Sequence, residues 1–144
     1  MKKRTMNILV TMDGNYIVHF NVMLVSLIHS NPDCCFEIYI LHSSLSEGLL
    51  DDTKKILGDY GRIILLQADD LDMGKAPVSE RYLKEIYYRI FASRYLPRDL
   101  DRILYLDPDI IVNGSLKNLY EISMEKYYFA AATHNEYLMR KINK

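Results

Sequence analysis

Short apolar runs alternate with segments of helical periodicity along most of this chain, and this alternation constrains its fold more than any other feature. Buried strands are predicted where the runs lie, at residues 7–12, 36–41, 63–66, 102–106 and 128–133. Helices are predicted where apolar residues recur at helical spacing, at residues 16–30, 46–60 and 79–95, and residues 116–122 are expected to form a short helix or a loop. This order predicts one domain over residues 1–144, a three-layer α/β/α fold with a mainly parallel sheet.

Local signals suggest where the helices begin and end. Asn15 is a candidate N-cap of the first helix, and Gly61 stands where a C-cap glycine would end the second. On the third helix, Ile90 is expected to face inward. Cys34 and Cys35 are adjacent and no C-x-x-C pair is present, so both are predicted to be free thiols.

Composition and missing motifs narrow the classes of function. The formal net charge is −1, with 18 basic and 19 acidic residues, which gives no case for a nucleic-acid partner. No apolar stretch approaches the ~20 residues that span a bilayer. We expect a cytoplasmic protein; its basic start, residues 2–4, is either solvated or in peripheral contact with the inner face of the membrane. Motifs of P-loop ATPases, dinucleotide oxidoreductases and serine hydrolases are missing from the sequence.

Asp107-Pro108-Asp109 follows the fourth predicted strand and is the sharpest chemical feature. Carboxylates two residues apart on an extended backbone point the same way, and hard cations such as Mn²⁺ or Mg²⁺ prefer oxygen ligands. Pro108 would stiffen the loop between them. The alternative is a solvated turn at the end of a strand, which the same residue types favour.

A second polar group, Asp13, Asn15 and Tyr16, follows the first predicted strand. Ligands of parallel α/β sheets bind beyond the carboxyl ends of the strands, so Asp13 could accept from a base or ribose and Tyr16 could stack on a base. Alternatively, Asn15 caps the helix and Tyr16 packs in its first turn. Arg89 either pairs with Asp107, reaches an anionic ligand, or lies on the surface.

Taken together, these groups resemble glycosyltransferase family 8, the family of bacterial lipopolysaccharide galactosyl- and glucosyltransferases and of glycogenin. The matching stretches are residues 7–16 (NILVTMDGNY), 88–91 (YRIF) and 102–112 (RILYLDPDIIV). The resemblance implies a GT-A-type, Rossmann-like fold and Mn²⁺ or Mg²⁺ held by Asp107 and Asp109, the family's D-x-D. It also implies a UDP-sugar donor whose uridine and sugar lie against Thr11, Asp13, Asn15, Tyr16, Arg89 and the loop at Pro108.

The implied reaction is metal-dependent transfer of a hexose from the UDP-sugar to a saccharide acceptor of the lipopolysaccharide or cell-surface glycan type, with retention of configuration. No catalytic residue is assigned. The family's Asn-Ala-Gly and His-x-x-Gly-x-x-Lys-Pro-Trp segments are missing, so we expect a GT-A fold truncated at the C-terminus and prone to form homo-oligomers. One alternative is a non-catalytic UDP-sugar-binding module. A more remote one is a haloacid-dehalogenase-like phosphatase with Asp107 as nucleophile and Asp109 as acid/base.

Overall fold

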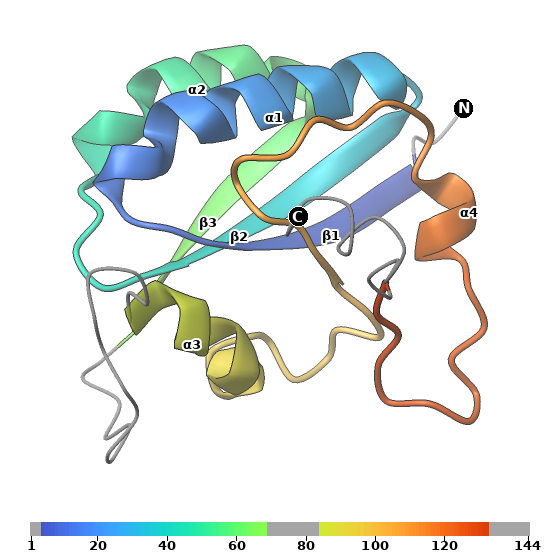
Figure 1. Cartoon of the computed structure of the whole chain (residues 1–144). Coiled ribbons are helices and arrows are strands. Elements are labelled where there is room, and N and C mark those ends of the chain that lie inside the picture. Colours follow the sequence, from blue (N-terminus) through green and yellow to red (C-terminus); the bar gives the residue numbers. More distant parts are fainter. Residues whose placement is uncertain (1–3, 69–83, 133–144) are drawn as a thin grey trace, which may run out of the picture.

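One sheet of four parallel strands organises the chain, and its strand order is β3-β2-β1-β4 (Figure 1). The computed structural model describes residues 4–68 and 84–132. The strands are β1 (Arg4–Thr11), β2 (Cys34–His42), β3 (Gly61–Gln67) and β4 (Leu104–Tyr105). All three pairings are parallel, so the four carboxyl ends lie along the same edge of the sheet.

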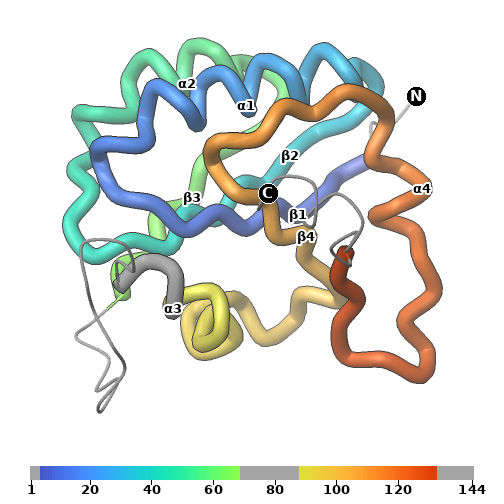
Figure 2. Tube along the Cα trace, viewed as in Figure 1, coloured from blue at the N-terminus to red at the C-terminus, as the bar shows by residue number. Residues whose placement is uncertain are grey.

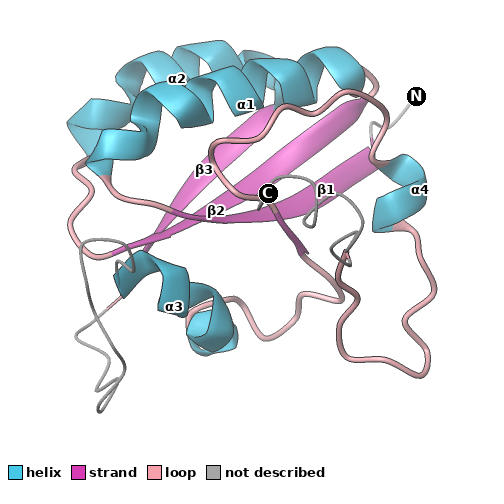
Figure 3. Ribbon diagram, in the orientation of Figure 1, coloured by secondary structure: helices cyan, strands magenta, loops and turns pink. Residues whose placement is uncertain are grey.

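Helices cover both faces of this sheet. The helix α1 (Ile17–Ser30) and the shorter α2 (Asp51–Leu57) lie on one face, and α3 (Lys84–Phe91) lies on the other (Figure 3). Further short turns are η1 (Gly14–Tyr16), η2 (Glu47–Leu50), η3 (Gly58–Tyr60), η4 (Ala92–Arg94) and α4 (Lys117–Tyr120). The predicted three-layer α/β fold with a parallel sheet is therefore confirmed. Within residues 4–68 and 84–132, every helix is too short or too polar to cross a bilayer.

The two central strands are apolar on both sides because each side is covered. Alternate residues of β1 and β2 enter the core beneath α1 and α2, including the fully buried Ile8 and Ile38. The intervening residues, including Leu9 and Leu41, pack with Tyr88 on the α3 side. Burial on both faces is the reason why these strands read as continuous apolar runs in the sequence.

Two predicted helix boundaries are wrong. Asp13 caps the turn η1, since its Oδ1 accepts a hydrogen bond from the Asn15 backbone N–H at 2.9 Å, and α1 begins only at Ile17. Asn15 is therefore the capped residue. At the other helix, α2 ends at Leu57 and its C-cap residue is Gly58, whose φ is 47°, while Gly61 is the first residue of β3. In both places a short 3₁₀ turn stands between the α-helix and the adjoining segment, and hydrophobic spacing does not reveal such a turn.

The sequence also overestimates the strands. The predicted fourth strand is regular only at Leu104–Tyr105, and residues 128–132 form no strand. Extended backbone needs a neighbouring strand for its hydrogen bonds, and no described strand pairs with residues 128–132; Thr133 lies outside the described residues. Ile90, predicted to face inward, is 68% exposed, and Tyr88 is buried instead. The first five residues of that predicted helix, 79–83, also lie outside the described part.

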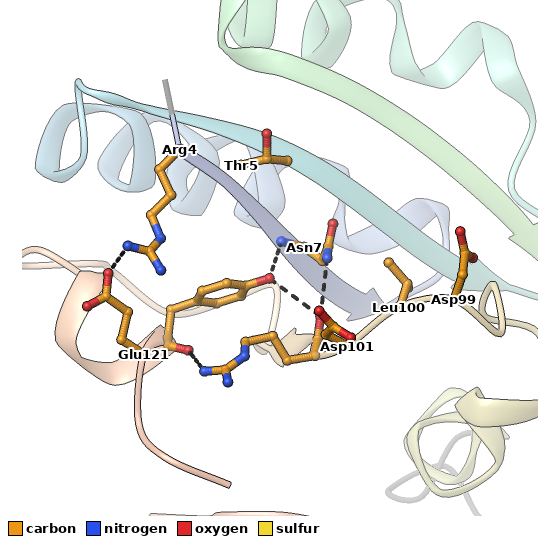
Figure 4. A pocket seen from close by; sticks show the side chains of 9 residues that line it. Arg4, Thr5, Asn7, Asp99, Leu100, Asp101 and Glu121 are labelled. Atoms are coloured by element: carbon orange, nitrogen blue, oxygen red, sulfur yellow. Dashed lines mark hydrogen bonds and ion pairs between the residues drawn. The ribbon is translucent and has the colours of Figure 1, made fainter. Parts of the chain in front are cut away.

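At the edge of the sheet where the strands begin, residues of α4 and of the segment before β4 form hydrogen bonds with β1. Asn7 donates its backbone N–H to the Tyr120 hydroxyl at 3.0 Å and its side-chain amide to the Arg102 carbonyl at 3.2 Å. Arg102 donates to the carbonyl of Tyr120, and Arg4 forms an ion pair with Glu121 (Figure 4). These contacts surround a polar pocket at the end of β1 opposite to Thr11. They anchor α4 where the short β4 leaves the Asn7 amide without a strand partner.

Candidate functional site

The carboxyl ends of β1 and β4 meet and bring together two segments that are far apart in the sequence (Figure 2). Leu9 is paired with Tyr105, and the Leu106 backbone N–H donates to the Leu9 carbonyl at 3.0 Å. Thr11 and Asp107 each lie two residues beyond this pair. The predicted polar groups of the first and fourth strands therefore share one edge of the sheet.

Tyr105 links Thr11 to Asp107. Its hydroxyl donates to Asp107 Oδ1 at 2.7 Å and lies 3.2 Å from the hydroxyl of Thr11. Because the phenol uses its only proton on Asp107, Thr11 must be the donor of the second bond. Burial, and then the bond to Asp107, raise the pKa of Tyr105 above its usual value of 10.0, so the hydroxyl stays a neutral donor at neutral pH.

Arg89 reaches the same group from α3. Its Nη1 lies 4.0 Å from Asp107 Oδ1, and its guanidinium carbon lies 5.8 Å from the centre of the Tyr105 ring. Both side chains are about half exposed, at 46% for Arg89 and 51% for Asp107. A pair this open and this long adds little to stability, so the guanidinium remains free to meet an anion. Of the three alternatives for Arg89, the structure favours the one in which Arg89 lies beside Asp107.

Asp13, Asn15 and Tyr16 form a separate group on this edge. Asp13 accepts from the backbone and from the side-chain amide of Asn15, at 2.9 and 3.1 Å. Tyr16 is half-buried against the core, with its ring centre 5.7 Å from that of His19. Among the described residues, no hydrogen bond or ion pair joins this group to Asp107 or Arg89. The packed position of Tyr16 agrees with the alternative of a ring in the first helical turn.

The loop after β4 leaves one carboxylate open. Pro108 is buried, whereas Asp109 is exposed and makes no hydrogen bond or ion pair with the described residues. Pro108 and Asp109 lie in a turn, so the buried proline ring anchors the loop while the Asp109 carboxylate faces solvent. The predicted solvated turn is therefore present, and it leaves Asp109 available to a ligand.

The donor set suits a hard divalent cation that is completed by its substrate. Within residues 4–68 and 84–132, no group of three or more His, Cys, Asp or Glu side chains could hold a metal ion by protein ligands alone. Asp107 and Asp109 would provide carboxylate oxygens, and Oδ2 of Asp107 accepts no hydrogen bond from the described residues. Mg²⁺ and similar ions are often held by one or two carboxylates together with substrate phosphates and water. The residues present fit that arrangement.

Comparison with known proteins decides the family. The sequence model of glycosyl transferase family 8 matches residues 7–144. The chain belongs to this family. The lipopolysaccharide 1,2-glucosyltransferase of Escherichia coli is 29% identical over 130 residues, which cover 90% of this chain and 38% of the relative. The lipopolysaccharide 1,3-galactosyltransferase of Salmonella typhimurium is 23% identical over 126 residues, 87% of this chain and 37% of the relative.

Solved structures agree with the assignment to family 8. The galactosyltransferase LgtC, crystallised with donor and acceptor sugar analogues, is 26% identical with a TM-score of 0.72, over 83% of this chain and 43% of LgtC. GlyE of Streptococcus pneumoniae, at 23% identity and a TM-score of 0.66 over 91% of this chain and 30% of GlyE, shares the fold. The predicted GT-A-type fold is confirmed, and the phosphatase alternative gains no support. The chain spans less than half the length of these relatives.

Sequence reasoning missed Tyr105. The signal was present, because Tyr105 and Asp107 are two residues apart on an extended backbone and therefore point to the same side. This spacing places the two side chains on one side but does not show that they form a hydrogen bond, because a tyrosine near the end of a strand is also common as a core residue.

Proposed function

We propose that the whole protein transfers a hexose from a UDP-sugar to a saccharide acceptor of the lipopolysaccharide or cell-surface glycan type. Membership of family 8 and likeness to lipopolysaccharide glycosyltransferases support this proposal. The observation that carries it is the meeting of Thr11, Arg89 and Asp107 at the carboxyl edge of β1 and β4. This edge is where ligands of parallel α/β sheets bind.

Within that site, Asp107 and Asp109 would hold Mn²⁺ or Mg²⁺, with the buried Pro108 limiting the motion of their loop. When bound, the cation supplies Lewis-acid stabilisation of the charge on the departing diphosphate. Arg89 would add a positive charge near the departing diphosphate, which would favour the transition state because negative charge grows there. Transfer with retained configuration is part of the proposal.

Thr11, Asp13, Asn15 and Tyr16 would hold the uridine. Asp13 already orients the Asn15 amide, whose carbonyl oxygen has no partner among the described residues and remains for a base or ribose group. The exposed edge of Tyr16 would border the base. The parts of the relatives that this chain does not cover correspond to residues that would complete the binding site of the saccharide acceptor.

The acceptor class suggests a cytoplasmic enzyme that works at the inner face of the membrane. The basic residues 2–4 are candidates for that contact; Lys2 and Lys3 lie outside the described residues. Homo-oligomers are a further part of the proposal. A module that binds donor without turnover remains the alternative, and assay of UDP release from UDP-sugars separates the two.

Thermal unfolding with MnCl₂ and UDP tests the binding site. A ligand at about 100 times its Kd stabilises the native state by about 2.7 kcal/mol, so Tm should rise clearly. Asp109→Asn should remove most of the gain that depends on Mn²⁺, because it removes a charged ligand without touching the core. Asp101→Asn is the matched control, an exposed aspartate before β4 at the opposite edge of the sheet. An equal gain in wild type and Asp109→Asn would contradict the proposed metal site.

A further inference from the structure

Asp107 owes its orientation to one neighbour. Its carboxylate is half exposed, and the only hydrogen bond that it accepts from the described residues comes from the Tyr105 hydroxyl. An aspartate side chain has two rotatable bonds, so a surface carboxylate without such a contact samples several orientations. The Tyr105 bond selects one of them and occupies Oδ1, which leaves Oδ2 for another ligand.

The Tyr105 phenol is itself firmly held. Its ring packs against the buried cluster beneath α3, and its hydroxyl accepts from Thr11, which is only 6% exposed at the end of β1. Thr11 belongs to β1, which pairs with β2 along its whole length, from Arg4 to Thr11. The orientation of Asp107 is thus fixed by a chain of contacts that ends in the core.

The same ring keeps Arg89 close to Asp107 without a direct bond. The guanidinium lies near the ring at 5.8 Å, while its Nη1 is 4.0 Å from Asp107 Oδ1, too long for a hydrogen bond. A bidentate Arg–carboxylate pair would occupy both oxygens and compete with a cation. Attraction to the ring offers the guanidinium a second position, so the carboxylate remains open.

We propose that Tyr105 is a positioning residue that fixes the Asp107 carboxylate for a divalent cation and keeps Arg89 beside it. This inference rests on the proposed function. Partners that orient metal-binding side chains typically change metal affinity 10- to 100-fold when they are removed. Tyr105 would act through Asp107 and does not itself bind the cation.

The chain offers a closely matched control in Tyr39. Its hydroxyl donates to Glu37 at 3.1 Å, so here too the accepting carboxylate is two residues away in the sequence. Tyr39 is buried on the same face of the sheet, but Glu37 pairs with Arg62 and lies in the amino half of β2. Tyr39→Phe therefore removes the same kind of bond from the same layer without touching the Asp107 group.

The experiment measures Mn²⁺ affinity by titration at saturating UDP, using wild type, Tyr105→Phe and Tyr39→Phe. We expect Tyr105→Phe to weaken Mn²⁺ binding by about 10- to 100-fold and Tyr39→Phe to change it less than about 2-fold. UDP affinity without metal should be the same in all three proteins. Urea unfolding without ligand should give similar small shifts for both variants, which separates positioning from general destabilisation.

Two results would overturn the inference. One is an unchanged Mn²⁺ affinity in Tyr105→Phe, and the other is an equal loss in Tyr39→Phe. Either result would leave the proposed function standing, because wild type would still bind Mn²⁺ with UDP. Failure of wild type to bind Mn²⁺ at saturating UDP is the separate outcome that would remove the proposed metal site. For a Tyr105→Phe protein that unfolds early, the titration is repeated at a lower temperature at which circular dichroism shows the variant folded; the same 10- to 100-fold loss is expected there, and wild-type affinity would overturn the inference.

Discussion

Among the glycines that the structure describes, Gly61 is the one whose replacement by alanine should destabilise the fold most. An ideal Cβ at Gly61 would lie 1.9 Å from the Phe36 carbonyl oxygen, against about 3.3 Å for an ordinary carbon–oxygen contact. The obstacle is the backbone of β2, which cannot move without breaking its pairing with β1. The φ of 156° adds strain for an L side chain. Overpacking and backbone strain each cost about 1–3 kcal/mol, so we expect Gly61→Ala to lose about 4 kcal/mol.

Two other glycines calibrate this value. Gly58 has a φ of 47°, but a methyl group added there would meet nothing within 4 Å, so Gly58→Ala should show strain alone, about 1–2 kcal/mol. Gly48 has an ordinary φ and open space, so Gly48→Ala should be neutral or slightly stabilising. Equilibrium urea unfolding of the three variants measures the series. A loss at Gly61 no larger than that at Gly58 would refute the argument that the Phe36 carbonyl blocks a side chain.

Further predictions concern two hydrogen bonds, one part-buried and one buried. Tyr120→Phe should cost about 1–3 kcal/mol and speed hydrogen exchange of the Asn7 amide, because that N–H loses its acceptor at 3.0 Å; unchanged exchange would contradict this. His42 accepts from the Leu45 N–H at 2.9 Å, and burial lowers the pKa of its imidazole below 6.5. The unfolded chain therefore takes up the proton first, so stability should be full above about pH 6.5 and fall as the pH drops toward the folded-state pKa. Urea midpoints from pH 8 to pH 5 should show this fall in wild type and a flatter profile in His42→Gln.

Much of the fold was predictable because periodicity reports burial. The central strands have both faces covered, and α1 has one buried stripe, so their apolar patterns are strong. The sequence pattern does not show, however, whether an apolar segment has a neighbouring strand to pair with. Val112, for example, lies in an apolar run that resembles a strand, yet its backbone bonds to the side chains of Ser26 and Ser30 on α1. Residues 128–132 show the same limit, since apolar character alone does not provide a neighbouring strand.

The site was predictable in location and less so in detail. Turn chemistry after two apolar runs placed Asp13 and Asp107 at one sheet edge, because parallel strands share their carboxyl ends. Contacts within the edge depend on distances that spacing does not encode. The bond from Tyr105 to Asp107, the internal pair of Asp13 and Asn15, and the 4.0 Å separation of Arg89 from Asp107 are all of this kind.

The pairing of β4 with β1 has a consequence for the order of folding. The strands β1, β2 and β3 are consecutive in the chain, whereas Thr11 and Tyr105 are 94 residues apart. Contacts between such distant residues need closure of a long loop, which makes them entropically costly and slow to form. During synthesis the first three strands emerge well before residue 104, so they can assemble while the fourth is still absent. Competence to bind a ligand at this edge would then arise late, with the last strand to join the sheet.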